Sequence, residues 1–363
     1  MSEQAQTVSN YNENAIAIAK AIASNYKAGP SSKRPREELF PDFNRSGLGV
    51  ALEYEQMGNQ PVSDQLAEQV DELGLTLEHL GLTLGTVIHG IDLKQPLTTH
   101  EIKVLRSCLL ERKVIFFREQ HLNEDEHVRF ARYFGELDAF PFGKPGNNPY
   151  VLHIHHNDQN PGRENGWHTD VTWMEEPSLG SIAQCDIVPP AGGDTLFADS
   201  YAAYQGLAPA LQRQLQDMDA IHDYRIFLAG RGRDALPESL AADIQTRIPF
   251  GVCHPVLRTH PETGKTALYI HGGFIRHDSL HHRGSDNSLD GDESRSIVKE
   301  LLAQHARPEY QCRFQWTPGS IAFWDNRAVQ HYAASDYHPH ERLLRRVTIS
   351  GDRPYYRPAV ELA

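Results

Sequence analysis

Two histidines and one aspartate of this chain could together bind a metal ion. His168 and Asp170 lie two residues apart, and His331 follows far along the sequence. Two imidazoles and one carboxylate on one face of a metal are the ligand set of non-heme Fe(II) oxygenases, which leaves positions open for a co-substrate and O2. The short His-x-Asp motif by itself fits equally well with histidines and a surface aspartate that make ordinary hydrogen bonds.

A strand expected after His331 makes the metal hypothesis more specific. Residues 342–349 alternate with a period of two, so Arg342, Leu344 and Arg346 should share one face while Arg345 lies on the other. A guanidinium group is always charged and pairs bidentately with carboxylate or sulfonate oxygens. A surface ion pair explains Arg345. Arg342 and Arg346 together, close to a metal site, predict anionic ligands.

The three metal ligands need particular backbone elements to bring them together. Side chains two residues apart leave the same side of an extended segment, so we expect His168 and Asp170 on a strand with Thr169 pointing away. His331 must then arrive from a different strand.

The rest of the sequence predicts a mainly β protein with flanking helices. The strands are short and separated by turn-rich loops, and the ligands come from distant segments, as in a double-stranded β-helix with a jelly-roll core. Hydrophobic periodicity predicts strands within 79–92 and at 114–117, and helices at 64–73, 99–111 (with Thr99 as a possible cap), 123–134, 208–218 and 294–306.

We divide the chain into an extension over residues 1–74 and a catalytic domain over 75–363. The extension should be partly helical, with one helix at 14–23 and a Pro/Ser/basic linker at 29–36. We expect it to wrap the catalytic domain or a neighbouring subunit. The polar stretch 276–292 reads as a loop, either solvated or acting as a lid or subunit contact.

Composition points to a cytoplasmic enzyme. The formal net charge of −13 argues against nucleic acid as a partner. The four cysteines contain no C-x-x-C pair and read as reduced thiols. No apolar run approaches the length of a membrane span, so we expect no membrane association.

The chain resembles the taurine dioxygenase family of Fe(II)- and 2-oxoglutarate-dependent dioxygenases, which includes alkylsulfatases and aryloxyalkanoate dioxygenases. The resemblance extends from about residue 75 to about residue 357. It is carried by several motifs in the order typical of the family: Gly135–Leu137, Trp167–Thr172, Gly192–Leu196, His254–Val256, Arg258–Pro261, Trp324–Arg327, Gln330–Ala333 and Arg342–Arg346.

This resemblance implies a role for each matched residue. His168, Asp170 and His331 would bind Fe(II), with no further catalytic side chain. Arg342 and Thr195 would hold the C5 carboxylate of 2-oxoglutarate, and Arg346 would pair with a sulfonate or sulfate of the substrate. The reaction would consume O2 and 2-oxoglutarate, release succinate and CO2, and hydroxylate a substrate C–H bond. The family also implies a homo-oligomer, a dimer or a tetramer.

Departures from the family pattern concern the substrate pocket. Phe140 stands where taurine dioxygenase has a histidine, and Glu164 stands where it has an asparagine. The residues expected to line a larger and more apolar pocket are Val171, Phe140, Phe142, Glu164, Phe227, Leu228 and Phe274. Such a pocket favours an anion with a sizeable apolar body over taurine, although buried phenylalanines often serve packing alone.

Three function classes remain open. The first is hydroxylation of an alkyl sulfonate or sulfate ester, with release of sulfite or sulfate. The second is the same catalyst acting on an aryloxyalkanoate, another carboxylate or an amino-acid-derived metabolite, by hydroxylation, desaturation or cyclisation. The third is a metal- or ligand-binding protein without catalysis. A second metal site at His153 and His155 is less expected, because no carboxylate or cysteine lies at ligand spacing.

Overall fold

The computed structural model of the chain describes residues 44–140, 148–226, 246, 248, 250–285 and 288–358. The helix expected at 14–23, the linker at 29–36, and Phe142, Phe227 and Leu228 lie outside the described residues. Residues 44–363 belong to one compact unit, and the description below concerns this unit alone.

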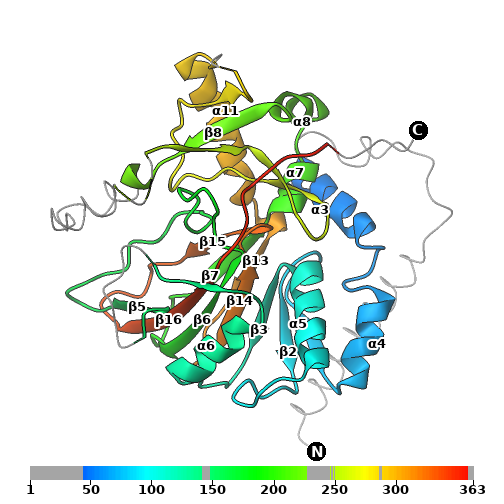
Figure 1. Cartoon of the computed structure of the whole chain (residues 1–363), viewed down its shortest axis with the longest axis vertical. Helices are drawn as coiled ribbons and strands as arrows, with labels where there is room; N and C mark the ends of the chain where they lie inside the picture. The colour runs from blue at the N-terminus through cyan, green and yellow to red at the C-terminus, as the bar shows by residue number, and fades with distance from the viewer. Residues whose placement is uncertain are drawn as a thin grey trace, which may run out of the picture. The chain divides into compact units, whose positions relative to one another are not determined.

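The largest sheet has eight strands and is mostly antiparallel (Figure 1). Its order along the sheet is β1 (Thr76–His79), β2 (Thr86–His89), β3 (Val114–Phe117), β14 (Ile321–Asp325), β6 (Gly180–Ile187), β16 (Arg342–Ile349) and β4 (Leu137–Asp138), with β5 (Val151–His156) also paired to β16. The strands expected at 114–117 and 342–349 are therefore confirmed at the residues predicted. The region 79–92 holds the end of β1, a turn and β2.

A second sheet faces the first and closes the jelly roll. It consists of β13 (Gln311–Phe314), β7 (Thr195–Asp199) and β15 (Val329–Ala333). Aromatic rings fill the space between the two sheets: Phe116 stacks on Phe314 with centroids 4.0 Å apart, and Phe197 packs edge-on against Phe116 at 5.5 Å. The expected mainly β jelly-roll core is thus present, with the candidate ligands on its inner side.

Two helices cover the outer face of the large sheet. They are α5 (Thr99–Arg112) and α6 (Glu124–Arg132). Thr98, and not the expected Thr99, caps α5: its side chain accepts a hydrogen bond from the Glu101 backbone, and the Glu101 carboxylate binds the Thr98 N–H in return. This reciprocal capping box satisfies two otherwise unpaired donors, which is why the helix begins one residue later than Thr98.

Residues 44–74 of the expected extension belong to this unit. They form α3 (Arg45–Gln56) and α4 (Asp64–Glu72). Gly49 of α3 lies so close to α7 (Ser200–Gln205) that a Cβ atom there would come within 2.4 Å of the Ala202 carbonyl oxygen. The Glu53 carboxylate of α3 is buried and pairs with Lys113 at 2.9 Å and with Lys265 at 2.8 Å.

The remaining elements are α8 (Pro209–Leu215), β8 (Met218–His222), β9 (Val252–Pro255), β10 (Leu257–Thr259), β11 (Thr266–Leu268), β12 (His281–His282), α11 (Gly291–His305) and the 3-10 turn Pro308–Tyr310. Of these elements, α8, β8 and α11 lie at the top of Figure 1. Residues 276–292 are not entirely loop, because β12 pairs with Met218 and Asp219 of β8. Arg283 fixes this segment further by donating to Asp219 at 2.9 Å. Such long-range pairing has no local sequence signature.

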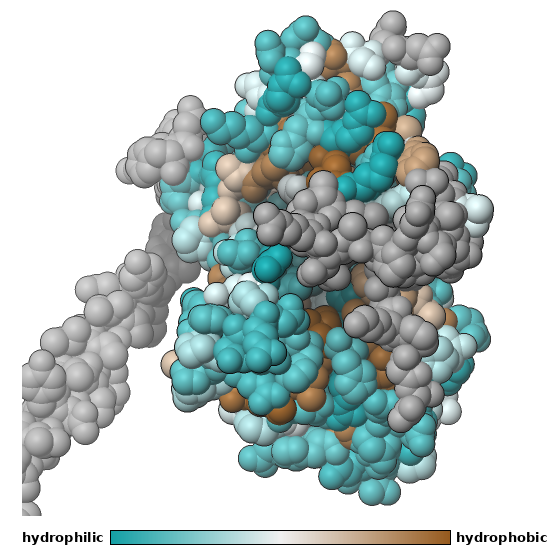
Figure 2. All heavy atoms as spheres, turned by 90° about the vertical axis from the view of Figure 1, so that its left-hand side faces the viewer, coloured by the Kyte–Doolittle hydropathy of each residue, from teal (hydrophilic) through white to brown (hydrophobic). Residues whose placement is uncertain are grey.

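The face of the molecule drawn in Figure 2 is mostly hydrophilic, with hydrophobic atoms showing in patches between polar groups. Within the described ranges, no helix is both long and apolar enough to cross a bilayer.

Candidate metal centre and co-substrate pocket

His168, Asp170 and His331 come together as the sequence predicted. One ligand atom from each lies within 4.8 Å of the others, and no second group of three such residues occurs among the residues described. Asp170 Oδ1 lies 3.8 Å from His168 Nε2 and 3.9 Å from His331 Nε2. His153 and His155 instead pair singly with Glu124 and Glu341, at 2.8 and 2.6 Å.

Backbone pairing brings the two histidines side by side. His331 lies on β15, and its N–H and C=O exchange hydrogen bonds of 2.9 and 3.1 Å with the main chain of His168. This single bridge sets the imidazole centroids 4.1 Å apart. His168 and Asp170 do not lie on a longer strand as expected, because the chain turns at Asp170 and Val171 adopts φ of +48°. The turn aims the carboxylate back toward the imidazoles.

The protonation of the ligands suits a divalent cation. His168 Nδ1 lies 2.8 Å from the Gly166 carbonyl, so Nδ1 carries the proton and Nε2 keeps a lone pair toward Asp170. Burial alone would raise the pKa of Asp170, but the Arg346 guanidinium and the two imidazoles lower it to about 2. Burial and the neighbouring His168 lower the pKa of His331 to about 3. One carboxylate and two imidazoles therefore converge on one point, and they fit the expected Fe(II).

Asn326 holds the main chain of Asp170. Its Oδ1 accepts from the Asp170 N–H at 2.9 Å, and its Nδ2 donates to the Asp170 carbonyl at 3.0 Å. Nδ2 also lies 3.0 Å from the Ser178 hydroxyl. Asn326 belongs to the matched motif 324–327, but sequence reasoning assigned it no role. The sequence feature that could have indicated its role is an amide side chain in the tight connection between β14 and β15.

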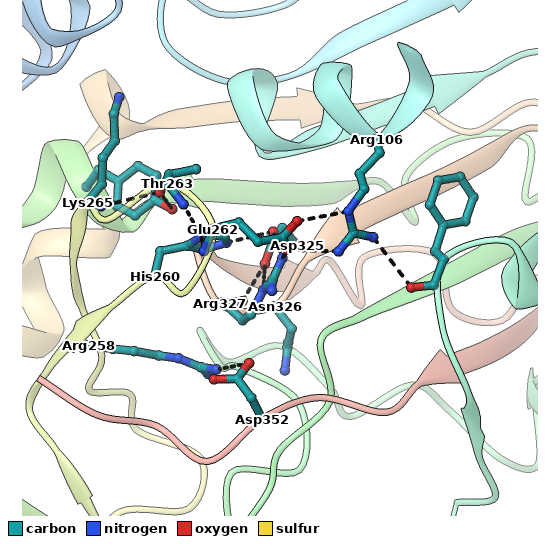
Figure 3. Close-up of polar contacts among 12 residues, drawn as sticks. Arg106, Arg258, His260, Glu262, Thr263, Lys265, Asp325, Asn326, Arg327 and Asp352 are labelled. Carbon is teal, nitrogen blue, oxygen red and sulfur yellow. Dashed lines mark hydrogen bonds and ion pairs between the residues drawn. The ribbon is translucent and has the colours of Figure 1, made fainter. Parts of the chain in front are cut away.

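Figure 3 shows how the connection that carries Asn326 is fixed. Asp325 accepts from His260 at 3.0 Å and from Arg327 at 2.9 and 2.7 Å. Arg327 reaches Glu262 at 2.8 Å, and Glu262 in turn pairs with Arg106 of α5. Asp325, Arg327 and His260 are almost fully buried. Since buried charges persist only when they are paired, this network leaves the turn little freedom.

A small cavity opens beside the metal ligands. Its walls come from the inner faces of both sheets. The lining residues are Ile154, His156, Glu164, His168, Ala183, Thr195, Phe197, Trp316, Trp324, His331, Ala333, Tyr337, Arg342, Leu344 and Arg346. The predicted period of β16 is thus confirmed, since Arg342, Leu344 and Arg346 all face this cavity.

Arg342 and Thr195 are placed to hold a carboxylate in the cavity. Arg342 is 3% exposed, and its Nε and Nη2 have no hydrogen-bond partner among the described residues. The Thr195 hydroxyl accepts from Trp316 Nε1 at 3.0 Å, which leaves its own proton to donate. A Cβ on Gly193 would come within 3.2 Å of Arg342 Cδ, so glycine at this position leaves room for the arginine stem. Buried unpaired donors call for an anionic partner.

Arg346 lines the same cavity and contacts the metal ligand Asp170. Its Nη1 is 2.9 and 3.0 Å from the two oxygens of Asp170, a contact that sequence reasoning did not foresee. Its Nε is buried and has no hydrogen-bond partner among the described residues. The guanidinium also lies 5.6 Å from the centre of the Phe140 ring.

The other expected pocket residues divide into two groups. Val171 and Phe274 belong to one apolar cluster with Trp173, against which Phe140 packs. Glu164 lines the cavity and lies 3.4 Å from His156 Nε2. Sequence reasoning missed His156, Trp316 and Tyr337 as cavity residues. His156 Nδ1 lies 2.7 Å from the Tyr337 hydroxyl.

Comparisons with known proteins agree with this geometry. An alkylsulfatase of Acinetobacter baylyi is 33% identical over 77% of this chain and 86% of its own length. An alpha-ketoglutarate-dependent sulfate ester dioxygenase of Pseudomonas putida is 34% identical over 80% of this chain and 94% of its own. The crystal structure of a taurine dioxygenase from Burkholderia xenovorans superposes with a TM-score of 0.64 at 33% identity, covering 77% of this chain and 90% of that one.

The match to the family itself covers residues 76–348. The expected enzyme class, an oxidoreductase that requires Fe(II), 2-oxoglutarate and O2, is confirmed by this match together with the relatives and the ligand triad. The chain belongs to the family described as taurine catabolism dioxygenase TauD, TfdA family.

Proposed function

We propose that this dioxygenase hydroxylates the carbon next to the sulfur-bearing group of an alkyl sulfate ester or alkyl sulfonate. The hydroxylated sulfate ester collapses to an aldehyde and sulfate, and a sulfonate collapses to an aldehyde and sulfite. One oxygen atom of O2 enters the substrate, and the other enters succinate as 2-oxoglutarate loses CO2. Bound iron supplies the activation of O2, and the chain supplies the positions of both organic molecules.

The observation that carries this proposal is a pair of arginines, Arg342 buried and Arg346 partly buried, that line the cavity and have unpartnered nitrogens. The unpartnered atoms among the described residues are Nε and Nη2 of Arg342 and Nε of Arg346, whose Nη1 contacts Asp170. Two separate guanidinium groups suit two separate anions. Arg342 and Thr195 would hold the distal carboxylate of 2-oxoglutarate, and Arg346 would hold the sulfate or sulfonate within reach of the metal.

The surroundings of Arg346 favour a substrate with an apolar body. Val171, Trp173 and Phe274 form a buried cluster there, and Phe140 packs against it. Apolar surface removed from water contributes roughly 25 cal/mol per Å², so an alkyl chain would add affinity that a short polar chain could not. The 33–34% identity to an alkylsulfatase and a sulfate ester dioxygenase points the same way.

A second candidate substrate is an aryloxyalkanoate or another carboxylate. Phe140 lies beside Arg346 and packs against the cluster that holds Trp173 and Phe274, and these aromatic rings favour such a substrate because they could pack against an aryl group. The guanidinium would accept a carboxylate as readily as a sulfate.

An anaerobic titration separates these candidates. Fe(II) and 2-oxoglutarate should together give a visible charge-transfer band, and the true substrate should shift that band. An n-alkyl sulfate, an n-alkyl sulfonate and an aryloxyacetate are then compared, and O2 is added to measure succinate and free sulfate or sulfite. Sulfate or sulfite equimolar with succinate supports the proposal. A response to the aryloxyacetate alone moves the function to the second candidate.

Arg346→Gln tests the role of the arginine directly. It should weaken the band shift caused by the alkyl sulfate by about 30-fold or more in substrate concentration, since a buried charge-assisted pair contributes about 2 kcal/mol or more. The concentration of 2-oxoglutarate needed for the band should change much less. Arg345→Gln is the matched control, because Arg345 lies on the opposite face of β16 and pairs with Asp186. If Arg346→Gln lost affinity for the alkyl sulfate and for 2-oxoglutarate equally, the assigned role would be contradicted.

We further infer a cytoplasmic location and a homo-oligomeric assembly. All four cysteines are free, and three of them are buried, which fits a reducing compartment. The assembly rests on family resemblance and is tested by light scattering of the full chain.

A further inference from the structure

Two buried histidines outside the metal centre meet at the hydroxyl of one threonine, and a third histidine packs beside them. Thr172 follows Asp170 by two residues and is fully buried. Its hydroxyl oxygen lies 2.8 Å from His271 Nε2 and 2.8 Å from His222 Nδ1. A third ring, His254, lies with its centroid 5.0 Å from that of His222. None of these side chains has a role in the proposed function.

The hydrogen bonds fix the direction of this cluster. The Gly273 N–H donates to His271 Nδ1 at 3.3 Å, so that nitrogen has no proton and Nε2 carries it. His271 Nε2–H therefore donates to the Thr172 oxygen. The single hydroxyl proton of Thr172 must then be donated to His222 Nδ1, which leaves the proton of His222 on Nε2.

The cluster also contacts the same turn at a second point. His254 Nε2 lies 2.9 Å from the Met174 carbonyl oxygen, so this nitrogen donates and Nδ1 is left as an acceptor. His222 Nε2 and His254 Nδ1 are both buried without a hydrogen-bond partner among the described residues.

All three rings must be neutral for this pattern to hold. Burial lowers the pKa of His222 and His271 well below the usual range, and it lowers the pKa of His254 to about 4. Each imidazole then has one N–H and one lone pair, as the directional chain requires.

The turn that receives these hydrogen bonds is strained at Val171. A β-branched residue at φ of +48° is unfavourable, and such a conformation persists only where the surroundings hold it. Val171 lies directly before Thr172 and directly after the ligand Asp170. The Met174 N–H bonds to the Val171 carbonyl at 2.9 Å, and Asn326 holds Asp170. The hydrogen bonds of Thr172 to His222 and His271 add a third contact that holds this turn.

The same histidines connect the turn to the opposite wall of the apolar cluster. His222 ends β8, and its neighbour Asp223 donates its N–H to the Phe274 carbonyl at 2.7 Å. The Phe274 ring lies 5.1 Å from that of His271 and 4.3 Å from that of Trp173, edge-on in both cases. Any shift of Thr172 against the histidines therefore changes the spacing of Trp173 and Phe274.

We propose that Thr172, His271 and His222 are positioning residues whose directional hydrogen bonds hold Val171 in its left-handed conformation and set the distance between the metal-ligand turn and Phe274. These hydrogen bonds thereby determine how the substrate's C–H bond is presented to the metal, although none of the three residues contacts the metal. This inference rests on the proposed function only in taking the Val171, Trp173 and Phe274 cluster as the substrate side.

Selective ¹⁵N-histidine NMR of the full-length protein tests the direction of these hydrogen bonds. Spectra are taken at pH 7 in the metal-free form and with Zn²⁺ as a diamagnetic substitute, and signals are assigned from His222→Gln and His271→Gln. Both histidines should be neutral with the proton on Nε2. In Thr172→Val, His222 should lose the signature of an accepted hydrogen bond at Nδ1. A proton on Nδ1 of His271 or His222 in the wild type would overturn the proposal.

Kinetics test the positioning role. Thr172→Val keeps the side-chain shape, and it should raise the substrate KM about tenfold and lower the product formed per succinate, because the substrate side is displaced. The KM for 2-oxoglutarate should stay within about twofold, and Thr172→Ser should restore both properties. Thr83→Val is the matched control, since Thr83 is also buried but donates to Asp199, far from the cluster, at 2.7 Å.

The outcomes separate this inference from the proposed substrate class. If the wild type turns over no sulfate ester or sulfonate, the proposed function fails while the NMR result still decides the hydrogen-bond chain. The positioning role would be overturned if Thr172→Val kept the wild-type substrate KM and the wild-type yield of product per succinate. It would also be overturned if Thr172→Ser changed both quantities as much as Thr172→Val does.

Discussion

Asn326 holds Asp170 through both sides of its peptide backbone. The amide oxygen accepts from the Asp170 N–H at 2.9 Å, and the amide nitrogen donates to the Asp170 carbonyl at 3.0 Å. A side chain thereby replaces the strand partner that the turning backbone lacks. The position of the only carboxylate in the ligand triad depends on this contact.

Asn326→Asp should weaken metal binding while the residue keeps its shape. The substitution removes the donor to the Asp170 carbonyl and to Ser178, and it adds a buried negative charge. Loss of such a supporting contact typically lowers metal affinity 10- to 100-fold. The Fe(II) titration in the presence of 2-oxoglutarate measures this. Asn160→Asp, in an exposed loop, is the control and should bind Fe(II) like the wild type. Unchanged affinity in Asn326→Asp would contradict the assigned contact.

Arg342→Gln should selectively weaken the binding of 2-oxoglutarate. The guanidinium is buried with Nε and Nη2 unpartnered, so it loses a charge-assisted pair with the distal carboxylate. We expect the KM for 2-oxoglutarate to rise about 30-fold, which corresponds to about 2 kcal/mol. Steady-state succinate formation at saturating substrate gives the value. Arg345→Gln on the same strand should leave that KM unchanged, and a comparable rise there would show that strand damage causes the effect.

Lys113→Met should destabilise the fold. Lys113 is buried and pairs with Glu53 at 2.9 Å and Asp199 at 3.0 Å. Removing the cation leaves two carboxylates buried, and breaking such a pair costs about 3–5 kcal/mol. Urea unfolding followed by tryptophan fluorescence measures the loss. Lys299→Met, whose side chain is exposed on α11, provides the matched control.

Glu53→Gln tests whether α3 belongs to the folded unit. Glu53 lies before the region that matches the family, yet it contacts Lys113 and Lys265 of that region. The substitution should lower the free energy of unfolding by about 1–3 kcal/mol, since a hydrogen bond to a charged group is weakened. Urea unfolding identical to that of the wild type would place α3 outside the cooperative unit.

His127 should make stability depend on pH. Burial lowers the pKa of His127 to about 4, from an ordinary value near 6.5. Between these values the unfolded chain binds the proton more readily than the folded chain does. The resulting stability is therefore complete above about pH 6.5 and is lost as the pH falls toward 4.

The His127→Gln variant isolates this contribution. Gln retains a donor for the Ile182 carbonyl, which His127 Nε2 reaches at 3.0 Å, but it does not titrate. The loss of unfolding free energy between pH 7 and pH 5 should be smaller in the variant by about 2 kcal/mol. Urea titrations at both pH values measure the difference. Equal losses in both proteins would show that His127 titrates normally.

The sequence alone was sufficient to predict the metal-binding residues and several of the strands and helices around them. The types and spacing of His168, Asp170 and His331, and the alternation of residues 342–349, were sufficient to predict the triad and the two inward arginines. The alternation of residues 342–349 is local, because a strand's period of two assigns each side chain to a face without reference to other segments. The helices α5 and α6 followed in the same way from their hydrophobic periodicity.

The tertiary structure decided how the site is held. The turn at Val171, the contact of Arg346 with Asp170, and the meeting of His222 and His271 at Thr172 each join segments separated by 50 residues or more, or depend on such contacts. Residues 44–75 are likewise joined to the domain by long-range contacts, among them the ion pair of Glu53 with Lys113, and Glu53 is a charge that reads as exposed in a sequence. Burial and partner choice are set by which segments pack together, and no local pattern of residues encodes them.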